Sequence, residues 1–163
     1  MRLSLALPAL AATAAQAVEL FDLTGAYWDA SVTTQTGRPG YEIKDVNVAF
    51  YNPLSTEAAP GSCHYSFVPN NGRPAITDTC EKGLGWNWDY TTLILTHKVL
   101  IKNETVTMYG SAALTSQCSG SGSSGGRTCK SVGKVELDHY CRTNEEAFGC
   151  YPPNGNACGD QCA

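Results

Sequence analysis

Residues 118–129 read CSGSGSSGGRTC, a glycine- and serine-rich loop with a cysteine at each end. A strand-like run, Thr105 to Leu114, leads into this loop, and a second run, Val132 to Tyr140, leads out of it. A loop of this composition has a large conformational entropy and no apolar anchor. A disulfide across its base would hold the two flanking strands together as a hairpin, and the expected fold is built outward from that hairpin.

Other segments also have the pattern of strands separated by turns. Glu42 to Tyr51 (EIKDVNVAFY) alternates between apolar and polar residues, with one register break near Lys44 that predicts a bulge. Turn signals rich in Gly, Pro and Asn recur roughly every ten residues, and no apolar stripe of helical period accompanies them. The sequence therefore predicts an all-β protein, namely a small disulfide-stabilised antiparallel β-barrel or sandwich with a cysteine-rich C-terminal tail.

The first 17 residues have the composition of a secretory signal peptide. Arg2 precedes an apolar run, Leu3 to Ala14, and Ala15-Gln16-Ala17 fits a cleavage site. The apolar run is too short to span a membrane. We therefore expect a secreted, extracellular protein with a signal peptide at 1–17, a β-barrel domain at 18–140 and a cysteine-rich tail at 141–163.

Eight cysteines follow the signal segment, and an even number in a secreted chain predicts disulfides. They are Cys63, Cys80, Cys118, Cys129, Cys141, Cys150, Cys158 and Cys162. Since eight cysteines allow about 105 complete pairings, spacing alone does not fix the connectivity. The last four could in principle bind zinc, but they lack the paired C-x-x-C unit of structural zinc sites. Disulfides are therefore favoured, and no metal or cofactor is expected.

The tail has little apolar material. Cys150 to Cys162 (CYPPNGNACGDQC) cannot form a core, so it must be stapled or disordered. The preceding stretch, Cys141 to Gly149, is compatible with a short helix because Thr143 and Glu146 fit a capping box.

Charge and motifs argue against several classes of partner. The formal net charge is −4, and no basic stripe is present to neutralise phosphates, so nucleic acid is not expected. A basic amphipathic helix for a membrane surface is also lacking. Residues 120–125 formally fit GxGxxG, but no apolar strand directly precedes them and no helix follows, so a nucleotide site is not indicated.

No residue set predicts a catalytic site. The three histidines are His64, His97 and His139, and the chain has no G-x-S-x-G motif. Asp138 and His139 are adjacent in a predicted strand, so their side chains would point to opposite faces. Asp45 with Glu42 could suggest a glycosidase acid pair, but lone carboxylates on strands are more often solvated.

Three aromatic residues form the candidate binding surface. Trp86, Trp88 and Tyr90 lie two residues apart and would share one face of a strand. Core packing is their more common role, and the alternative is an exposed row that stacks on a sugar ring or a partner surface. Separately, Asn103-Glu104-Thr105 is an N-glycosylation sequon in a predicted turn, where a glycan would be accessible.

Between about Thr24 and Tyr140, several segments together resemble a known family. They are GAYWDASV with GRPG, VNVAFYN, GWNWDYTTLILTHKVL, TVTMYGSAAL, and the spacings of Cys63 with Cys80 and of Cys118 with Cys129. These segments are similar to the secreted β-barrel family typified by the major allergen of Alternaria moulds. The resemblance implies the disulfides Cys63–Cys80 and Cys118–Cys129, while the four later cysteines lie at or beyond the end of the family pattern.

The resemblance also implies a function. Members of this fungal family have no established enzyme activity and act as allergens, or as effectors that contact plant defence proteins. We therefore expect a non-enzymatic effector- or allergen-like protein that binds a host protein or a small apolar ligand. The alternatives are a secreted carbohydrate-binding or hydrolytic protein, and a structural cell-wall protein. Because the allergen dimerises through a cysteine near its mature N-terminus and this chain has none between Val18 and Ser62, a disulfide-linked dimer is doubtful.

Overall fold

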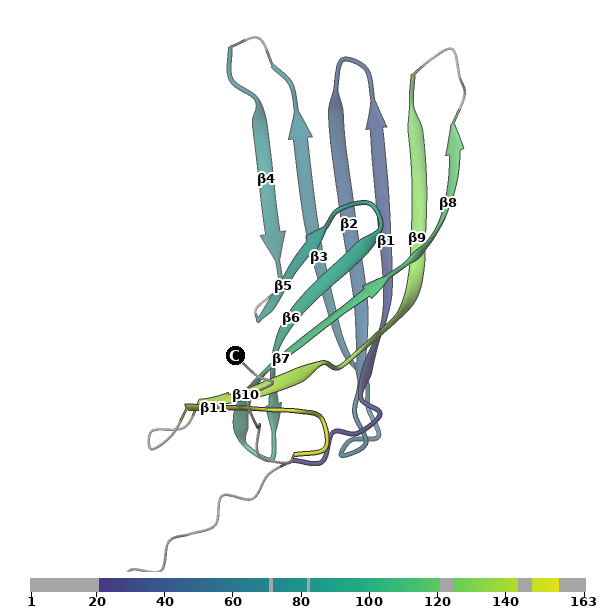
Figure 1. Cartoon of the computed structure of the whole chain (residues 1–163). Helices are drawn as coiled ribbons and strands as arrows, with labels where there is room; N and C mark the ends of the chain where they lie inside the picture. Colours follow the sequence, from purple (N-terminus) through teal and green to yellow (C-terminus); the bar gives the residue numbers. More distant parts are fainter. Residues whose placement is uncertain (1–20, 71, 82, 121–124, 144–147, 156–163) are drawn as a thin grey trace, which may run out of the picture.

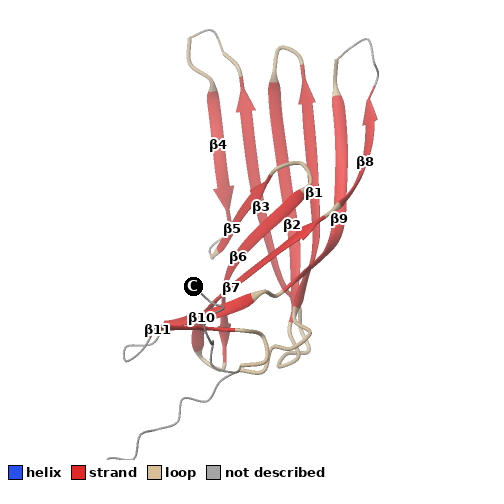
Figure 2. Cartoon of the chain, in the orientation of Figure 1, coloured by secondary structure: helices blue, strands red, loops and turns tan. Residues whose placement is uncertain are grey.

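The computed structural model describes residues 21–155 except for 71, 82, 121–124 and 144–147. The described residues form eleven β-strands, and Figure 2 shows the absence of helices among them. No helix in this part of the chain is long and apolar enough to cross a membrane. The predicted all-β class is confirmed. In chain order the strands are β1 (Tyr27–Gly37), β2 (Tyr41–Tyr51), β3 (Ala59–Val68), β4 (Ala75–Cys80), β5 (Leu84–Trp88), β6 (Thr92–Ile101), β7 (Glu104–Ala113), β8 (Thr115–Gly120), β9 (Arg127–Glu136), β10 (His139–Thr143) and β11 (Phe148–Tyr151).

The strands pair into two antiparallel sheets (Figure 1). The large sheet has the order β4-β3-β2-β1-β9-β8, and the small sheet has the order β11-β10-β7-β6-β5. The chain passes between the sheets three times, in the connection from β4 to β5, at Leu114 between β7 and β8, and at Leu137-Asp138 between β9 and β10. Both sheets keep free edges, so the molecule is a sandwich. The sequence predicted either a barrel or a sandwich, and the closed barrel is not formed.

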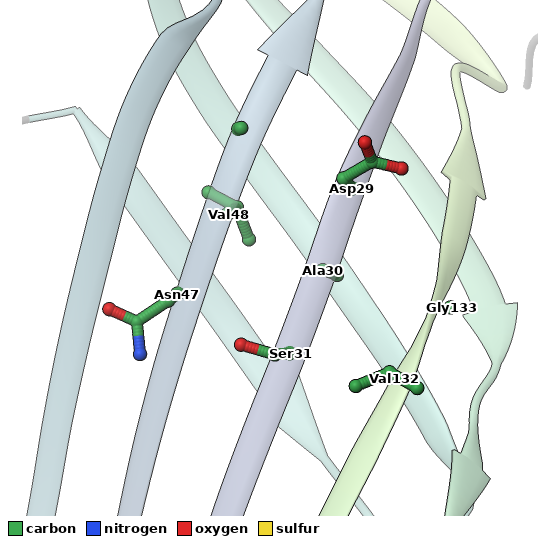
Figure 3. Close-up of a pocket in the computed structure, with 8 residues that line it drawn as sticks. Asp29, Ala30, Ser31, Asn47, Val48, Val132 and Gly133 are labelled. Carbon is green, nitrogen blue, oxygen red and sulfur yellow. The ribbon is translucent and has the colours of Figure 1, made fainter.

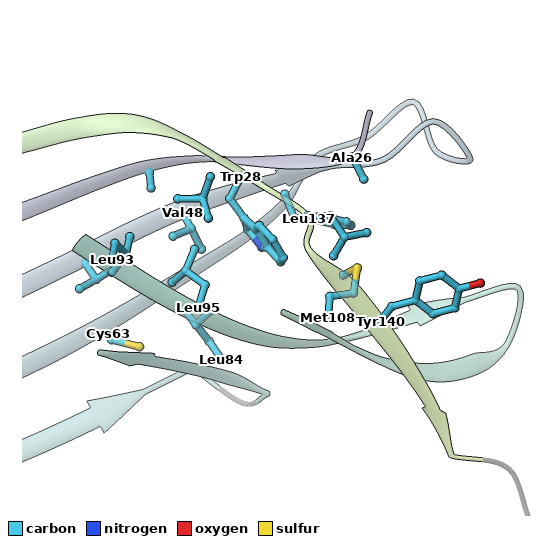
Figure 4. Close-up of a cluster of buried hydrophobic side chains, with 14 of the residues drawn as sticks. Ala26, Trp28, Val48, Cys63, Leu84, Leu93, Leu95, Met108, Leu137 and Tyr140 are labelled. Carbon is cyan, nitrogen blue, oxygen red and sulfur yellow. The ribbon is translucent and has the colours of Figure 1, made fainter. Parts of the chain in front are cut away.

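The core lies between the sheets and is formed by the inward-facing residues of both (Figure 4). Trp28 is fully buried, and its ring centroid lies 4.9 Å from that of Phe50. Gly110 of β7 in the small sheet lies against Trp28 of β1 in the large sheet. A Cβ at Gly110 would lie 2.5 Å from the carbonyl oxygen of Glu136 and 2.7 Å from the Trp28 ring, so no larger side chain fits there unless the packing shifts.

Three disulfides fasten edge strands to their neighbours. They are Cys63–Cys80 between β3 and β4, Cys118–Cys129 between β8 and β9, and Cys141–Cys150 between β10 and β11. The first two are the pairs that the family resemblance implies, and the second closes the glycine-rich loop as expected. The strands that it joins differ from the prediction, because the run Thr105 to Leu114 is mostly β7, which pairs with β6 and β10 in the small sheet, and the partner of β9 is the separate strand β8. Strands β4 and β8 are exposed along their whole length, so burial contributes little to holding them and the covalent link is needed. Cys158 and Cys162 lie outside the described residues.

The structure differs from the prediction in three local features. Ala75–Cys80, a polar stretch in which we predicted no strand, forms the edge strand β4. A short helix was predicted at Cys141 to Gly149. In its described part, residues 141–143 belong to β10 and residues 148–149 belong to β11, because β10 pairs with both β7 and β11. Strand β2 pairs with β1 at every position, so the predicted bulge near Lys44 is absent. Strand β10 also runs through Tyr140, so the small sheet continues past the predicted domain boundary.

The large sheet extends beyond the small one. Figure 1 shows the β1–β2, β3–β4 and β8–β9 hairpins projecting together past the end of the β5–β6 hairpin. The small sheet therefore covers only part of the inner face of the large sheet. The outer face of the large sheet points away from the core altogether.

Candidate functional site

The outer face of the six-stranded sheet carries a hollow over its central strands. Asp29 and Ser31 of β1, Asn47 of β2 and Val132 of β9 line it, and Figure 3 shows their side chains on one side of the sheet. Their neighbours Ala30 and Val48 face the core, as the alternation of a strand requires. The hollow has a volume of about 430 Å³, and Val132 within it is 45% exposed.

A second, more polar hollow lies beside the first on the same face and shares Asn47 with it. It has a volume of about 670 Å³, and hydroxyl groups and the Cys63–Cys80 disulfide line part of it. Asp45 of β2 and His64 of β3 are directly paired in register here, and Asp45 Oδ1 lies 2.6 Å from His64 Nδ1. Both side chains are more than two-fifths exposed, so this contact contributes little to stability.

The Asp45–His64 pair provides two parts of a hydrolase triad. The carboxylate orients the imidazole, as in serine hydrolases. A nucleophile should then donate a hydrogen bond to the other ring nitrogen, but no hydroxyl in the described part of the chain does so. Ser62, which lines the same hollow, donates instead to Glu81 Oε1 at 3.0 Å.

The other histidines lie elsewhere. His97 of β6 is buried, and burial lowers its pKa below the usual 6.5. His139 of β10 stacks on Tyr109, with ring centroids 4.6 Å apart. Asp138, its neighbour in sequence, accepts a hydrogen bond from Ser111. The three histidines therefore do not form a common site.

An aromatic pair lies at one end of the outer face. Tyr27 of β1 and Tyr51 of β2 are directly paired, and their rings stack at 5.1 Å. The ammonium of Lys134 lies over the Tyr27 ring at 4.1 Å. Tyr51 remains 40% exposed. The sequence pattern did not predict this pair, because the pair depends on the register of two strands and the alternation within each strand does not reveal that register.

The candidate row Trp86, Trp88 and Tyr90 does not form one exposed surface. Trp88 is only 5% exposed and belongs to the core, and Trp86 packs against that core. The indole nitrogen of Trp88 is buried and has no hydrogen-bond partner among the described residues. Tyr90 lies beyond β5, in a turn where its φ is +72°, and is 55% exposed. The spacing correctly placed the two tryptophans on one face, but that face points inward.

Tyr90 links the turn between β5 and β6 to the large sheet. Its hydroxyl donates a hydrogen bond to Glu42 of β2, and this bond is the main cause that raises the pKa of Tyr90 to about 12. Lys44, whose ammonium lies 3.3 Å from Glu42 Oε1, sits over the rings of Tyr90 and Tyr65. Glu42 thus points to the inner face while Asp45 points to the outer face, so the two cannot act together as a glycosidase acid pair.

Asn103 lies in the turn between β6 and β7. Lys102 and Asn103 have positive φ values of 47° and 67°, and Ile101 pairs with Glu104 across the turn, as in a two-residue hairpin turn. Asn103 is exposed, and so is Thr105, the third residue of the sequon. The acceptor nitrogen is therefore sterically accessible to a glycosyltransferase.

No protein-family model, curated protein or solved structure matches this chain. Among the described residues, no group of three or more His, Cys, Asp or Glu side chains is arranged to hold a metal ion. The most extensive candidate site is the outer face of the large sheet, with its two hollows and the Tyr27–Tyr51 pair.

Proposed function

We propose that this chain is a secreted, non-enzymatic protein that binds a partner protein through the outer face of its six-stranded sheet. The observation that carries the proposal is the continuity of this exposed face. It runs from the stacked Tyr27–Tyr51 pair, through the hollow at Asn47 and Val132, to the Asp45–His64 pair.

The size of the face fits a protein partner. Four of its strands have ten or eleven residues and the two edge strands have six. With a rise of about 3.4 Å per residue and strands about 4.8 Å apart, the face measures about 880 Å². This is close to the area of about 800 Å² that each partner contributes to a protein–protein interface of standard size.

The chemistry of the face also favours a protein over a small apolar ligand. Ligand pockets enclose most of the surface of a small molecule, whereas both hollows lie open on the sheet. Tyrosine is enriched in protein interfaces, where it often contributes a large part of the binding energy. Charges of both signs, Asp29 and Lys134 among them, lie on the same face and could form the polar rim of such an interface.

The disulfides support an extracellular role. All six cysteines in the described residues are paired, as expected for an oxidising compartment. Together with the signal-like N-terminal sequence and the resemblance to fungal effectors, this favours a plant defence protein of the host as the partner. Secretion into the extracellular space would bring the two proteins together.

A second candidate function is hydrolysis at the polar hollow. The observation that favours it is the 2.6 Å contact between Asp45 and His64 beside several hydroxyl groups. A bound substrate or water molecule would have to supply the group that His64 activates.

Affinity capture with matched variants tests the proposal. The oxidised protein is immobilised as wild type, Val132→Glu and Ile94→Glu, and each is exposed to plant extracellular fluid. Val132 and Ile94 are 45% and 48% exposed on the outer faces of the large and small sheets, so the two changes are matched in chemistry and exposure. We expect one host protein to be retained by wild type and Ile94→Glu and lost with Val132→Glu.

Three results would contradict the proposal. One is equal retention of the same protein by all three forms. Another is a wild-type dimer in solution that Val132→Glu dissociates, because a second copy would then occupy the face. The third is turnover of a polysaccharide or ester substrate that His64→Ala abolishes, which would support the hydrolytic candidate instead.

A further inference from the structure

Three of the four arginines in the described residues lie at three hairpin ends of the large sheet. Arg38 lies in the turn between β1 and β2, Arg73 lies in the turn between β3 and β4, and Arg127 begins β9 after the turn from β8. All three are exposed. The fourth, Arg142, is buried in the small sheet and donates a 2.9 Å hydrogen bond to Glu104.

The sheet topology makes these three ends neighbours. The strand order β4-β3-β2-β1-β9-β8 places the three hairpins side by side, and Figure 1 shows them projecting in the same direction. Successive hairpins are offset by two strands, which is about 10 Å. Arg38 packs against the β8–β9 connection, since a Cβ on Gly125 would lie 3.1 Å from its Cγ and Nε atoms. We call Arg38, Arg73 and Arg127 together the arginine edge.

The arginine edge is positive on a protein that is otherwise acidic. The segments 36–41, 68–75 and 119–128 contain no aspartate or glutamate, whereas the whole chain has a formal net charge of −4. The nearest carboxylate along β2, Glu42, already interacts with Tyr90 and Lys44. No carboxylate in these three segments therefore neutralises the arginines.

We propose that the arginine edge binds a linear acidic polysaccharide through its carboxylate groups. Arginine has a planar fork that matches a carboxylate with two parallel hydrogen bonds. Because the three hairpin ends lie in a row, an extended chain that crosses them can present one carboxylate to each arginine. The site is separate from the outer face, so this binding would add to the proposed protein interaction and does not depend on it.

The structure favours a polysaccharide over two other polyanions. A nucleic-acid duplex is broad, so it would also approach carboxylates on the strands next to the hairpin ends, such as Asp45 of β2 and Asp78 of β4. Stable binding to a membrane surface also draws on apolar side chains that insert beside the charges, and these ends offer Val68 as the one exposed large apolar residue in the described parts of the three segments. A thin, charged sugar chain needs neither a broad basic surface nor an apolar anchor.

A binding assay with two charge-matched triple variants tests this inference. The probe is polygalacturonate, and neutral dextran, duplex DNA and phosphatidylserine vesicles are compared with it. The variants are Arg38→Gln/Arg73→Gln/Arg127→Gln and the control Lys98→Gln/Lys130→Gln/Lys134→Gln, which removes the same charge from exposed residues elsewhere. The melting temperature of each variant checks its fold. Arg73→Gln alone serves as a second test, because Arg73 makes no side-chain hydrogen bond or ion pair with another described residue.

We expect polygalacturonate to bind the wild type and the lysine control, and to bind the arginine triple variant at least tenfold more weakly. Three arginine–carboxylate contacts predict a slope of about −2 when the logarithm of the association constant is plotted against the logarithm of the salt concentration for the wild type. In the arginine triple variant this slope should approach zero. Arg73→Gln should reduce the slope by about one third. Equal weakening in both triple variants, absence of polygalacturonate binding, or tighter binding of DNA or vesicles than of polygalacturonate would each overturn the inference.

Discussion

The indole nitrogen of Trp28 donates a hydrogen bond to Nδ1 of His97, 3.3 Å away, in the centre of the core. A ring nitrogen that accepts a hydrogen bond carries no proton, so the buried imidazole is neutral with its proton on Nε2. The Phe50 ring meets the same imidazole edge-on at 6.4 Å. The two sheets are therefore joined at this point by a contact that requires an uncharged histidine.

This contact predicts that the protein loses stability in acid. Burial lowers the pKa of His97 in the folded state below 6.5, its ordinary value, although the charge of Glu81 acts in the opposite direction. Below pH 6.5 the unfolded chain binds more protons at this position, so the free energy of unfolding falls as the pH drops from 6.5 toward the folded-state pKa. Urea unfolding at a series of pH values measures this slope.

His97→Gln removes the titrating group. In this pH range the free energy of unfolding should therefore fall less steeply with decreasing pH in the variant than in the wild type. His139→Gln is the control, because it removes a histidine that is only partly buried and stacks on Tyr109, and it leaves the Trp28–His97 contact in place. Identical slopes for wild type and His97→Gln would show that other groups control the acid sensitivity.

The close approach at Gly110 predicts a strong effect of one added methyl group. Gly110→Ala places Cβ against the Glu136 carbonyl and the Trp28 ring, and we expect a loss of about 2–3 kcal/mol in the free energy of unfolding. At Gly126 the nearest atom to an added Cβ is 3.9 Å away, so Gly126→Ala should change stability by less than about 0.5 kcal/mol. Denaturant unfolding of Gly110→Ala and Gly126→Ala measures both losses of stability. Equal losses would contradict the close packing around Gly110.

The link between Tyr90 and Glu42 predicts a shifted phenol titration. Phenolate absorbance of the folded wild type should show one tyrosine with a pKa of about 12, and this step should be absent in Tyr90→Phe. Glu42→Gln should move the same step back toward 10 because the carboxylate is its main cause. Tyr90→Phe should also cost about 0.5–1 kcal/mol of stability, the usual value for one hydrogen bond at a partly exposed site. An unchanged titration curve in Tyr90→Phe would contradict the contact.

The sequon at Asn103 predicts a glycan when the protein is secreted from a eukaryotic host. Thr105→Ala is the better test than a change at Asn103, because it removes the sequon without altering the residue that holds a φ of +67°. Enzymatic removal of N-glycans should reduce the mass of the wild type and leave Thr105→Ala unchanged. If the wild-type mass does not change on this treatment, the sequon is not used.

Much of the sandwich could be predicted from local pattern. Alternation identified β2, and the cysteines that bracket the glycine-rich loop predicted a clipped hairpin there, although the run expected to lead into it is β7 of the small sheet and the hairpin strand is β8. Strand β4 was missed because both of its faces are exposed, so its sequence, AITDTC, has no alternation to detect. At Cys141–Gly149 the capping pattern was overridden by pairing with β7 and by the Cys141–Cys150 disulfide, neither of which is local.

The candidate sites were harder to predict because they depend on which strands are neighbours. The spacing of Trp86 and Trp88 gave the shared face but not its direction, and burial places them toward the core. Arg38, Arg73 and Arg127 are far apart in the sequence and come together only through the order of the hairpins. The signal available beforehand was that each follows a glycine in a turn segment free of acidic residues.

The most direct test of the proposed function maps the partner-binding surface by NMR on the methyl-labelled protein. On addition of the captured partner, the methyl signals of Val132 and Ala49, on the outer face of the large sheet, should shift or broaden. The methyl signals of Ile94 and Leu100, which are 48% and 70% exposed on the small sheet, should stay unchanged. Perturbation of Ile94 and Leu100 with Val132 and Ala49 unaffected would contradict the assignment of the outer face as the binding surface.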